Sequence, residues 1–174
     1  MRSTRPIKHS AYILISGLII MGLGACGTYS FTGASISPDT KTISIDRFPN
    51  NAMTVEPTLS QKFTDALRDK FQRETNLTLL NKGGDLHIEG SIIGYRTSPV
   101  AIQSNETAAM NRLTITVEVT FTNEVDDSKS YKSTFSRFED YPSTQNLNDV
   151  QETLIDQINE YLIQDIFDKA VVNW

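Results

Sequence analysis

A run of nine residues, Leu113 to Phe121, alternates without error between apolar and polar side chains. Alternation with a period of two indicates a strand with one buried face and one face in water. The apolar positions are Leu113, Ile115, Val117, Val119 and Phe121, and the polar positions are Thr114, Thr116, Glu118 and Thr120. Residues 125–128 form a turn, and residues 129–138 form a partner strand. The run therefore predicts an antiparallel hairpin that needs other elements to cover one face.

Two segments with helical periodicity can supply that cover. Apolar side chains fall on one stripe of residues 58–75, and Thr58 with Gln61 matches a capping box at the start. Residues 148–172 carry a wider apolar face, again at helical spacing. Both segments are expected to be amphipathic helices that pack against the sheet.

The remaining strand signals complete the predicted sheet. Residues 41–48 alternate, residues 76–80 form a short strand or the approach to one, and residues 85–95 form a further strand. The apolar positions change parity between Gly90 and Gly94, which predicts a β-bulge there. The expected fold is α+β, a two-layer sandwich in which two helices cover one face of a mixed sheet of about four strands. The crossover through the first helix should join two parallel strands with right-handed connectivity.

The N-terminus has the pattern of a bacterial lipoprotein signal. Basic residues at positions 2, 5 and 8 precede an apolar run, residues 11–23, and the run closes in Leu23-Gly24-Ala25-Cys26. We expect cleavage before Cys26, the single cysteine of the chain, and acylation of its thiol, for example with palmitate. An ordinary secretory signal or a membrane anchor are the alternatives, although a spanning helix needs about 20 apolar residues.

Cleavage at that point would divide the chain into three parts. Residues 1–25 would be the signal peptide, residues 26–39 a lipidated tether, and residues 40–174 a single α/β domain. The mature chain would have 149 residues, with 13 basic against 21 acidic side chains. An acidic balance of this size argues against a nucleic-acid partner, because binding to phosphates needs clustered Lys and Arg.

The mature sequence offers little for catalysis. His87 is its single histidine and lies within an expected strand, and no serine sits in a Gly-x-Ser-x-Gly motif. One histidine without a further thiol does not match the usual zinc or copper sites. We therefore expect no enzyme activity, no catalytic residues, no metal site and no cofactor.

Residues 96–110 form the longest stretch without a periodic signal, and we expect a loop there. Long loops in small domains often bind partners. The predicted contacts are Arg96, Pro99, Val100 and Ile102, together with Arg112 beyond the loop. Arginines can donate to carboxylates or phosphates, and the apolar residues offer surface that a monomer gains little by exposing. The alternative is that the loop folds back over an open end of the core.

Several local strings, taken with the order of elements, resemble the LptE family of lipopolysaccharide-assembly lipoproteins. The strings are residues 26–33, 42–45 with 48–50, 59–64, 111–115 and 169–174. The resemblance implies a non-catalytic plug inside an LptD-like outer-membrane β-barrel, which helps the barrel to deliver lipopolysaccharide to the cell surface. It also implies a protein anchored by lipid to the periplasmic face of the outer membrane, possible contact with lipopolysaccharide, and no nucleic acid. The alternative is a free-standing periplasmic lipoprotein that binds a small apolar or envelope ligand.

Overall fold

The computed structural model describes residues 36–54, 56–100 and 109–172. It contains two long helices and five strands, with short helical turns at 127–129 and 168–172. In chain order the main elements are β1 (Thr42–Ile45), α2 (Leu59–Glu74), β2 (Thr78–Leu80), β3 (Leu86–Val100), β4 (Met110–Asn123), β5 (Tyr131–Pro142) and α3 (Leu147–Phe167). Cys26, the predicted signal peptide (residues 1–25) and Ile102 lie outside the described residues.

The five strands form one mixed sheet in the order β2-β1-β3-β4-β5. β1 is parallel to both of its neighbours, whereas β3, β4 and β5 form an antiparallel meander. The predicted parallel crossover through the first helix is therefore confirmed. The expected count of about four strands was too low, because residues 78–80 form a separate strand on the outer side of β1.

The alternating run of β4 has the burial that its pattern predicts. All five apolar positions from Leu113 to Phe121 are buried, and the threonines between them are half-buried on the opposite face. β3 follows the same rule up to Ile92, where the pairing with β4 shifts between Ile92 and Gly94. This irregularity is the predicted bulge, and it returns Tyr95 to the buried face opposite Ile115.

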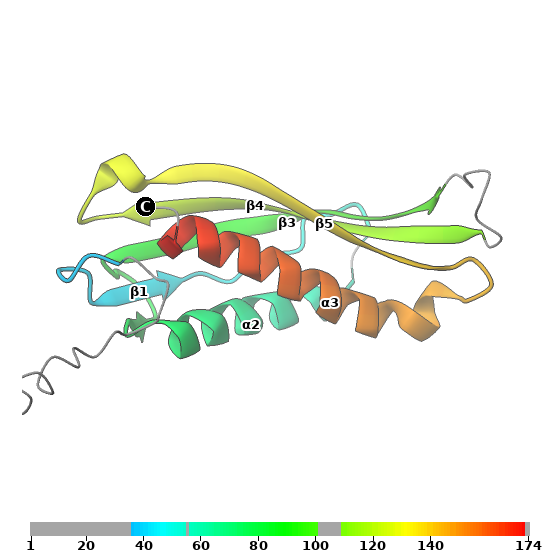
Figure 1. Ribbon diagram of the computed structural model, residues 1–174, viewed down its shortest axis with the longest axis horizontal. Coiled ribbons are helices and arrows are strands. Elements are labelled where there is room, and N and C mark those ends of the chain that lie inside the picture. Colours follow the sequence, from blue (N-terminus) through cyan, green and yellow to red (C-terminus); the bar gives the residue numbers. More distant parts are fainter. Residues whose placement is uncertain (1–35, 55, 101–108, 173–174) are drawn as a thin grey trace, which may run out of the picture. The chain divides into compact units, whose positions relative to one another are not determined.

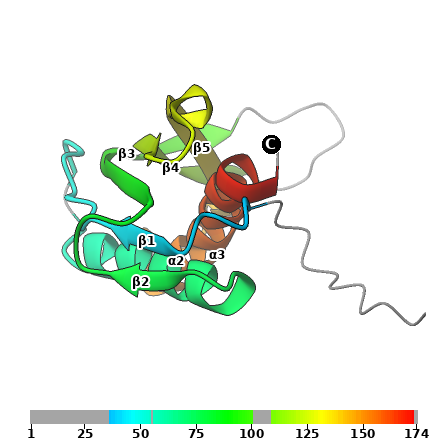
Figure 2. The same ribbon diagram turned by 90° about the vertical axis from the view of Figure 1, so that its left-hand side faces the viewer.

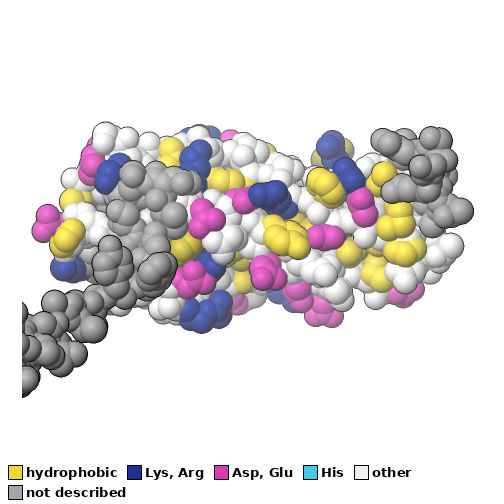
Figure 3. All heavy atoms as spheres, viewed as in Figure 1, with side chains coloured by type: hydrophobic (Ala, Val, Ile, Leu, Met, Phe, Trp, Pro, Cys, Tyr) yellow, Lys and Arg dark blue, Asp and Glu magenta, His cyan; other side chains and the backbone are white. Residues whose placement is uncertain are grey.

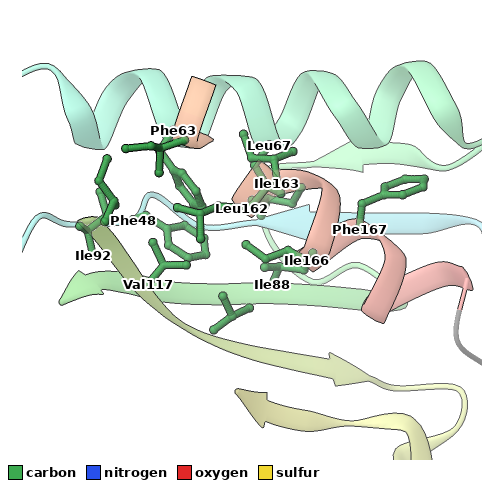
Figure 4. Close-up of a cluster of buried hydrophobic side chains, with 14 of the residues drawn as sticks. Phe48, Phe63, Leu67, Ile88, Ile92, Val117, Leu162, Ile163, Ile166 and Phe167 are labelled. Atoms are coloured by element: carbon green, nitrogen blue, oxygen red, sulfur yellow. The ribbon is translucent and has the colours of Figure 1, made fainter. Parts of the chain in front are cut away.

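Both helices pack against the apolar face of the sheet, and they lie beside each other over it (Figures 1 and 2). α2 contributes Phe63, Leu67 and Phe71 to the core, and the last turns of α3 contribute Leu162, Ile166 and Phe167 (Figure 4). Ring contacts join these elements: the centroid of Phe48, which follows β1, lies 5.1 Å from that of Phe63 in α2, and the centroid of Phe71 in α2 lies 5.1 Å from that of Phe167 in α3. No helix in the described part of the chain is long and apolar enough to cross a membrane.

The expected capping box at the start of α2 was wrong. Thr58 occupies the cap position but makes no side-chain cap hydrogen bond. Its hydroxyl instead donates to Glu56 Oε1 at 3.0 Å, and Gln61 Nε2 donates to Asp65 Oδ2 at 2.8 Å. The Thr58 hydroxyl is therefore bonded to a carboxylate two residues earlier in the chain, and the Gln61 amide to a carboxylate one helical turn later. Neither side chain is left to cap the start of the helix.

The expected loop over residues 96–110 was also too long. β3 continues to Val100 and β4 begins at Met110, so residues 96–100 are paired strand residues. Arg96 pairs with Thr114, Pro99 with Asn111 and Val100 with Met110. The connection between the two strands is residues 101–109.

Candidate functional site

Most of the residues that the sequence predicted as partner contacts lie at one end of the meander, where β3 ends and β4 begins. Residues that pair directly across an antiparallel sheet point to the same face. The face opposite the core therefore presents three rows here: Arg96, Thr114 and Phe138; then Ser98, Arg112 and Asp140; then Val100, Met110 and Pro142. We call these nine residues the distal patch.

Arg112 contacts two other members of the distal patch, Asp140 and Phe138. Its Nε and Nη2 donate to the two carboxylate oxygens of Asp140 at 2.7 and 2.8 Å. Its guanidinium carbon also lies 3.6 Å from the ring centroid of Phe138, which is a cation–π contact. The hydrogen bonds from Arg112 hold the pKa of Asp140 below its ordinary value, and the same bonds raise the pKa of Arg112. Most of the charge of Arg112 is therefore balanced within the sheet.

The other predicted contacts are open to solvent. Residues 96–99 are exposed, and beyond Ile92 the described structure gives β3 a strand neighbour on the β4 side alone. Phe138 is 48% exposed although its ring is large and apolar. Among the described residues, Arg96 has no ion pair. Of the predicted contacts, the structure thus brings Arg96, Arg112 and Val100 onto one face of the sheet and places Pro99 on the opposite face. It also adds Phe138 to the candidate contacts, a residue that the sequence analysis had assigned only to a strand.

A second surface feature is a groove of about 420 Å³ between α2 and α3. Eight of its ten lining residues are charged or carry an amide, and its two lysines are held in ion pairs. Lys62 Nζ lies 2.9 Å from Glu152 and 3.1 Å from Asp156, and Lys70 Nζ lies 2.6 Å from Glu74. Figure 3 shows acidic and basic side chains interspersed over the helices rather than gathered by sign.

A third feature was missed by the sequence analysis, which placed His87 only within an expected strand. His87 is half-buried, and its Nε2 lies 3.8 Å from Asp46 and 3.8 Å from Glu89. His87 and Glu89 stand two apart in β3, so they share a face, and Asp46 follows β1, the neighbouring strand. The sequence shows that His87 and Glu89 stand two residues apart, but it does not show that β1, and with it Asp46, lies beside β3.

The sequence of the folded region decides the family. Residues 40–170 match the family model of LptE, described as lipopolysaccharide-assembly. The chain belongs to the LptE family. The resemblance read from the local strings is thereby confirmed over nearly all of the folded region. No curated protein shows a significant sequence match to the chain.

Solved structures similar to this chain come from several bacteria. A neuraminyllactose-binding hemagglutinin homolog from Helicobacter pylori matches with a TM-score of 0.51 at 7% identity, covering 81% of this chain and 88% of its own. A protein from Xanthomonas campestris matches with a TM-score of 0.50 at 10% identity, covering 77% and 83%. Rare lipoprotein B from Shewanella oneidensis matches with a TM-score of 0.42 at 11% identity, covering 72% and 89%. At these identities, the two higher scores show a shared α+β fold.

Proposed function

We propose that this LptE-family protein is a lipid-anchored, non-catalytic partner of an LptD-like outer-membrane β-barrel in lipopolysaccharide assembly. The observation that carries the proposal is the family match over residues 40–170. The lipoprotein signal that ends at Cys26 supports attachment to a membrane through acyl chains. The absence of an acidic residue from positions 27–33 supports the periplasmic face of the outer membrane, because an acidic run there exports some lipoproteins to the cell surface.

The distal patch is our candidate for the contact with the barrel. Phe138 exposes apolar surface that association would bury, and Arg112 lies against one face of its ring. Exposed Arg96 can donate to a carboxylate on a barrel wall or to a lipid phosphate. Aromatic and arginine side chains are the residue types that most often anchor interfaces. Pro99, Val100 and Ile102 belong to the same hairpin end and are included in the proposed contact.

The alternative function, a free-standing lipoprotein with a ligand between sheet and helices, has no support in the packing. That space is filled by the buried side chains of both layers (Figure 4). A ligand there would have to displace fully buried residues such as Phe63 and Leu162. Displacing close-packed side chains costs the contacts that hold the two layers together.

Co-purification from detergent-solubilised membranes tests the proposal. The tagged wild-type protein should retain a β-barrel of much larger mass in a near-stoichiometric amount. The double variant Arg96→Ala, Phe138→Ala should retain less of it, whereas Lys132→Ala should behave as wild type. Lys132 is a suitable control because it is an exposed cation on the same face of β5, away from the distal patch. A wild-type preparation without a barrel would refute the proposed partnership.

A second variant separates docking from a purely structural role of the hairpin end. Replacing residues 100–102 with Ser-Gly-Ser should leave the melting temperature nearly unchanged and weaken barrel retention. If the variant loses several degrees of melting temperature and still retains the barrel, the hairpin end covers the core instead, and the assignment of the distal patch is wrong.

A further inference from the structure

Three metal-ligating side chains meet on the polar face of the sheet, on β1 and β3. The parallel register places Ser44 beside His87 and Ile45 beside Ile88, and the Asp46 amide donates to the Ile88 carbonyl at 2.9 Å. Asp46 therefore arrives next to Glu89, which shares its face with His87. One nitrogen or oxygen atom from each of Asp46, His87 and Glu89 lies within 4.8 Å of the other two.

The spacing of these atoms suits a shared cation better than it suits direct hydrogen bonds. His87 Nε2 is 3.8 Å from Asp46 Oδ2 and 3.8 Å from Glu89 Oε2, which is beyond the reach of an N–H···O bond. The three atoms form a triangle whose third side, between the two carboxylate oxygens, is at most 4.8 Å. A point at equal distance from all three atoms therefore lies at most about 2.5 Å from each of them. Zinc binds nitrogen and carboxylate oxygen at about 2.0 to 2.2 Å. Rotations that move each side chain by a few tenths of an ångström would close the difference.

The far side of the imidazole ring is already fixed. His87 Nδ1 lies 2.8 Å from the hydroxyl of Ser44, a fully buried residue, and the same hydroxyl accepts the Gly84 amide at 3.3 Å. A hydroxyl oxygen has two lone pairs, so it can accept from both Nδ1–H and the Gly84 amide. With the proton on Nδ1, Nε2 presents its lone pair to the two carboxylates. Metal-binding histidines characteristically have their second nitrogen held in this way.

The charge around the cluster also favours a cation. Neither Asp46 nor Glu89 forms an ion pair with a lysine or arginine among the residues that the structure describes. Their side chains are 44% and 55% exposed, and that of His87 is 27% exposed, so an ion can enter and keep water ligands. Two carboxylates and a neutral imidazole would present a charge of about −2 to the ion.

We propose that Asp46, His87 and Glu89 form a binding site for a divalent transition-metal ion of the zinc class. One imidazole and two carboxylates supply three protein ligands, and water completes the coordination. Because Asp46 follows β1 and the other two residues belong to β3, the ion would join these two strands. The site lies at the end of β1 and in the first half of β3, whereas the distal patch takes Arg96, Ser98 and Val100 from the second half of β3, so this inference stands apart from the proposed function.

Calorimetric titration of the metal-free protein with zinc chloride tests the proposal. The full chain without an affinity tag should carry Cys26→Ser in every variant, so that the free thiol cannot bind zinc. The protein should bind one Zn²⁺ with micromolar affinity, and His87→Gln should abolish the binding. Asp46→Asn and Glu89→Gln should each weaken it by about tenfold or more, and Ser44→Ala, which removes the positioning hydroxyl, by about tenfold. Glu118→Gln, on the same face of β4, is the matched control and should bind as the parent does.

The melting temperature gives a second readout that depends on the folded state. Zinc should raise it for the parent and for Glu118→Gln, because an ion that binds only the folded chain stabilises it. Zinc should not raise it for His87→Gln. Equal zinc affinities for the parent and His87→Gln, or no binding by the parent at millimolar zinc, would overturn the proposal and leave His87 as the partner of two carboxylates only.

Discussion

Replacing Gly90 with alanine tests how tightly β3, β4 and Phe48 pack. Gly90 pairs with Val119, and the ring of fully buried Phe48 lies against it. A Cβ atom at Gly90 would overlap the carbonyl oxygen of Glu118 and would lie 2.6 Å from Phe48 Cε1. A backbone oxygen in the middle of a sheet cannot rotate away, so β3 and β4 must separate there and the Phe48 ring must shift.

Two costs then add. Overpacking a core typically costs about 1–3 kcal/mol, and each weakened ladder hydrogen bond costs about 0.5–1.5 kcal/mol. We expect Gly90→Ala to lose about 3 kcal/mol or more of the free energy of unfolding, which is roughly 10 °C in melting temperature for a domain of this size. Urea denaturation followed by circular dichroism measures the free energy, and a thermal scan measures the temperature.

Gly94→Ala is the matched control on the same strand. Its Cβ would meet Thr116 Cβ at 3.1 Å and Thr116 Oγ1 at 3.2 Å, on the polar face, where a side chain can give way. The loss should stay within about 1 kcal/mol, because alanine also restricts the unfolded chain favourably. If Gly90→Ala loses less than about 1 kcal/mol, or no more than Gly94→Ala does, the packing of β3 against β4 at Gly90 is not as close as described.

Three further predictions concern the core, an ion pair and the anchor. Val117 and Ile158 are fully buried, so Ile158→Ala should cost about 2–5 kcal/mol in urea unfolding and Val117→Ala somewhat less; losses below about 0.5 kcal/mol would contradict their place in the core. The folded chain lowers the pKa of Asp140 through Arg112, so the stability from this pair is complete above the unfolded value, about 3.9, and is lost as the pH falls through the lower folded value. Melting temperatures between pH 6 and pH 2 should therefore fall less in Arg112→Ala than in the wild type, and identical pH profiles would count against the pair. Mass spectrometry of protein from membranes should find acylated Cys26 as the N-terminus, and Cys26→Ser should release the protein from membranes without lowering its melting temperature; an intact Met1 would refute the lipoprotein signal.

The sequence predicted the parts of the fold in which one face is buried and the other is wet. The alternation from Leu113 to Phe121 identified β4 and its buried face. The parity change between Gly90 and Gly94 located the bulge, because a strand that keeps one face in the core must insert a residue to restore register.

The same reasoning failed at residues 96–100, because a strand without a buried face has no alternation of apolar and polar side chains. Both faces of this part of β3 are largely open to solvent, so neither face selects apolar side chains. Pro99 fits within β3 because the strand has one strand neighbour at that point among the described residues, and proline is tolerated where its nitrogen need not donate to a partner.

The candidate sites were predictable only in part for a different reason. Arg96 and Arg112 were chosen from the sequence, but nothing near Arg112 in the chain revealed Asp140, 28 residues away, as its partner. Likewise, Asp46 and His87 are brought together by the parallel pairing of β1 with β3. Pairings between distant segments are a property of the sheet, and local periodicity does not encode them.

The place of β1 in the sheet has a consequence for the order in which the chain can assemble. The first strand in the chain lies between two strands that come later, β2 and β3. A chain that emerges N-terminus first therefore presents β1 before either neighbour exists, and its buried Ile43 and Ile45 must wait until residue 88 has followed. The β3–β4–β5 meander, by contrast, pairs strands that follow one another directly in the chain. We therefore expect the pairings of the meander to form between neighbouring segments of the chain, whereas β1 gains its full set of strand hydrogen bonds only once both β2 and β3 have followed it.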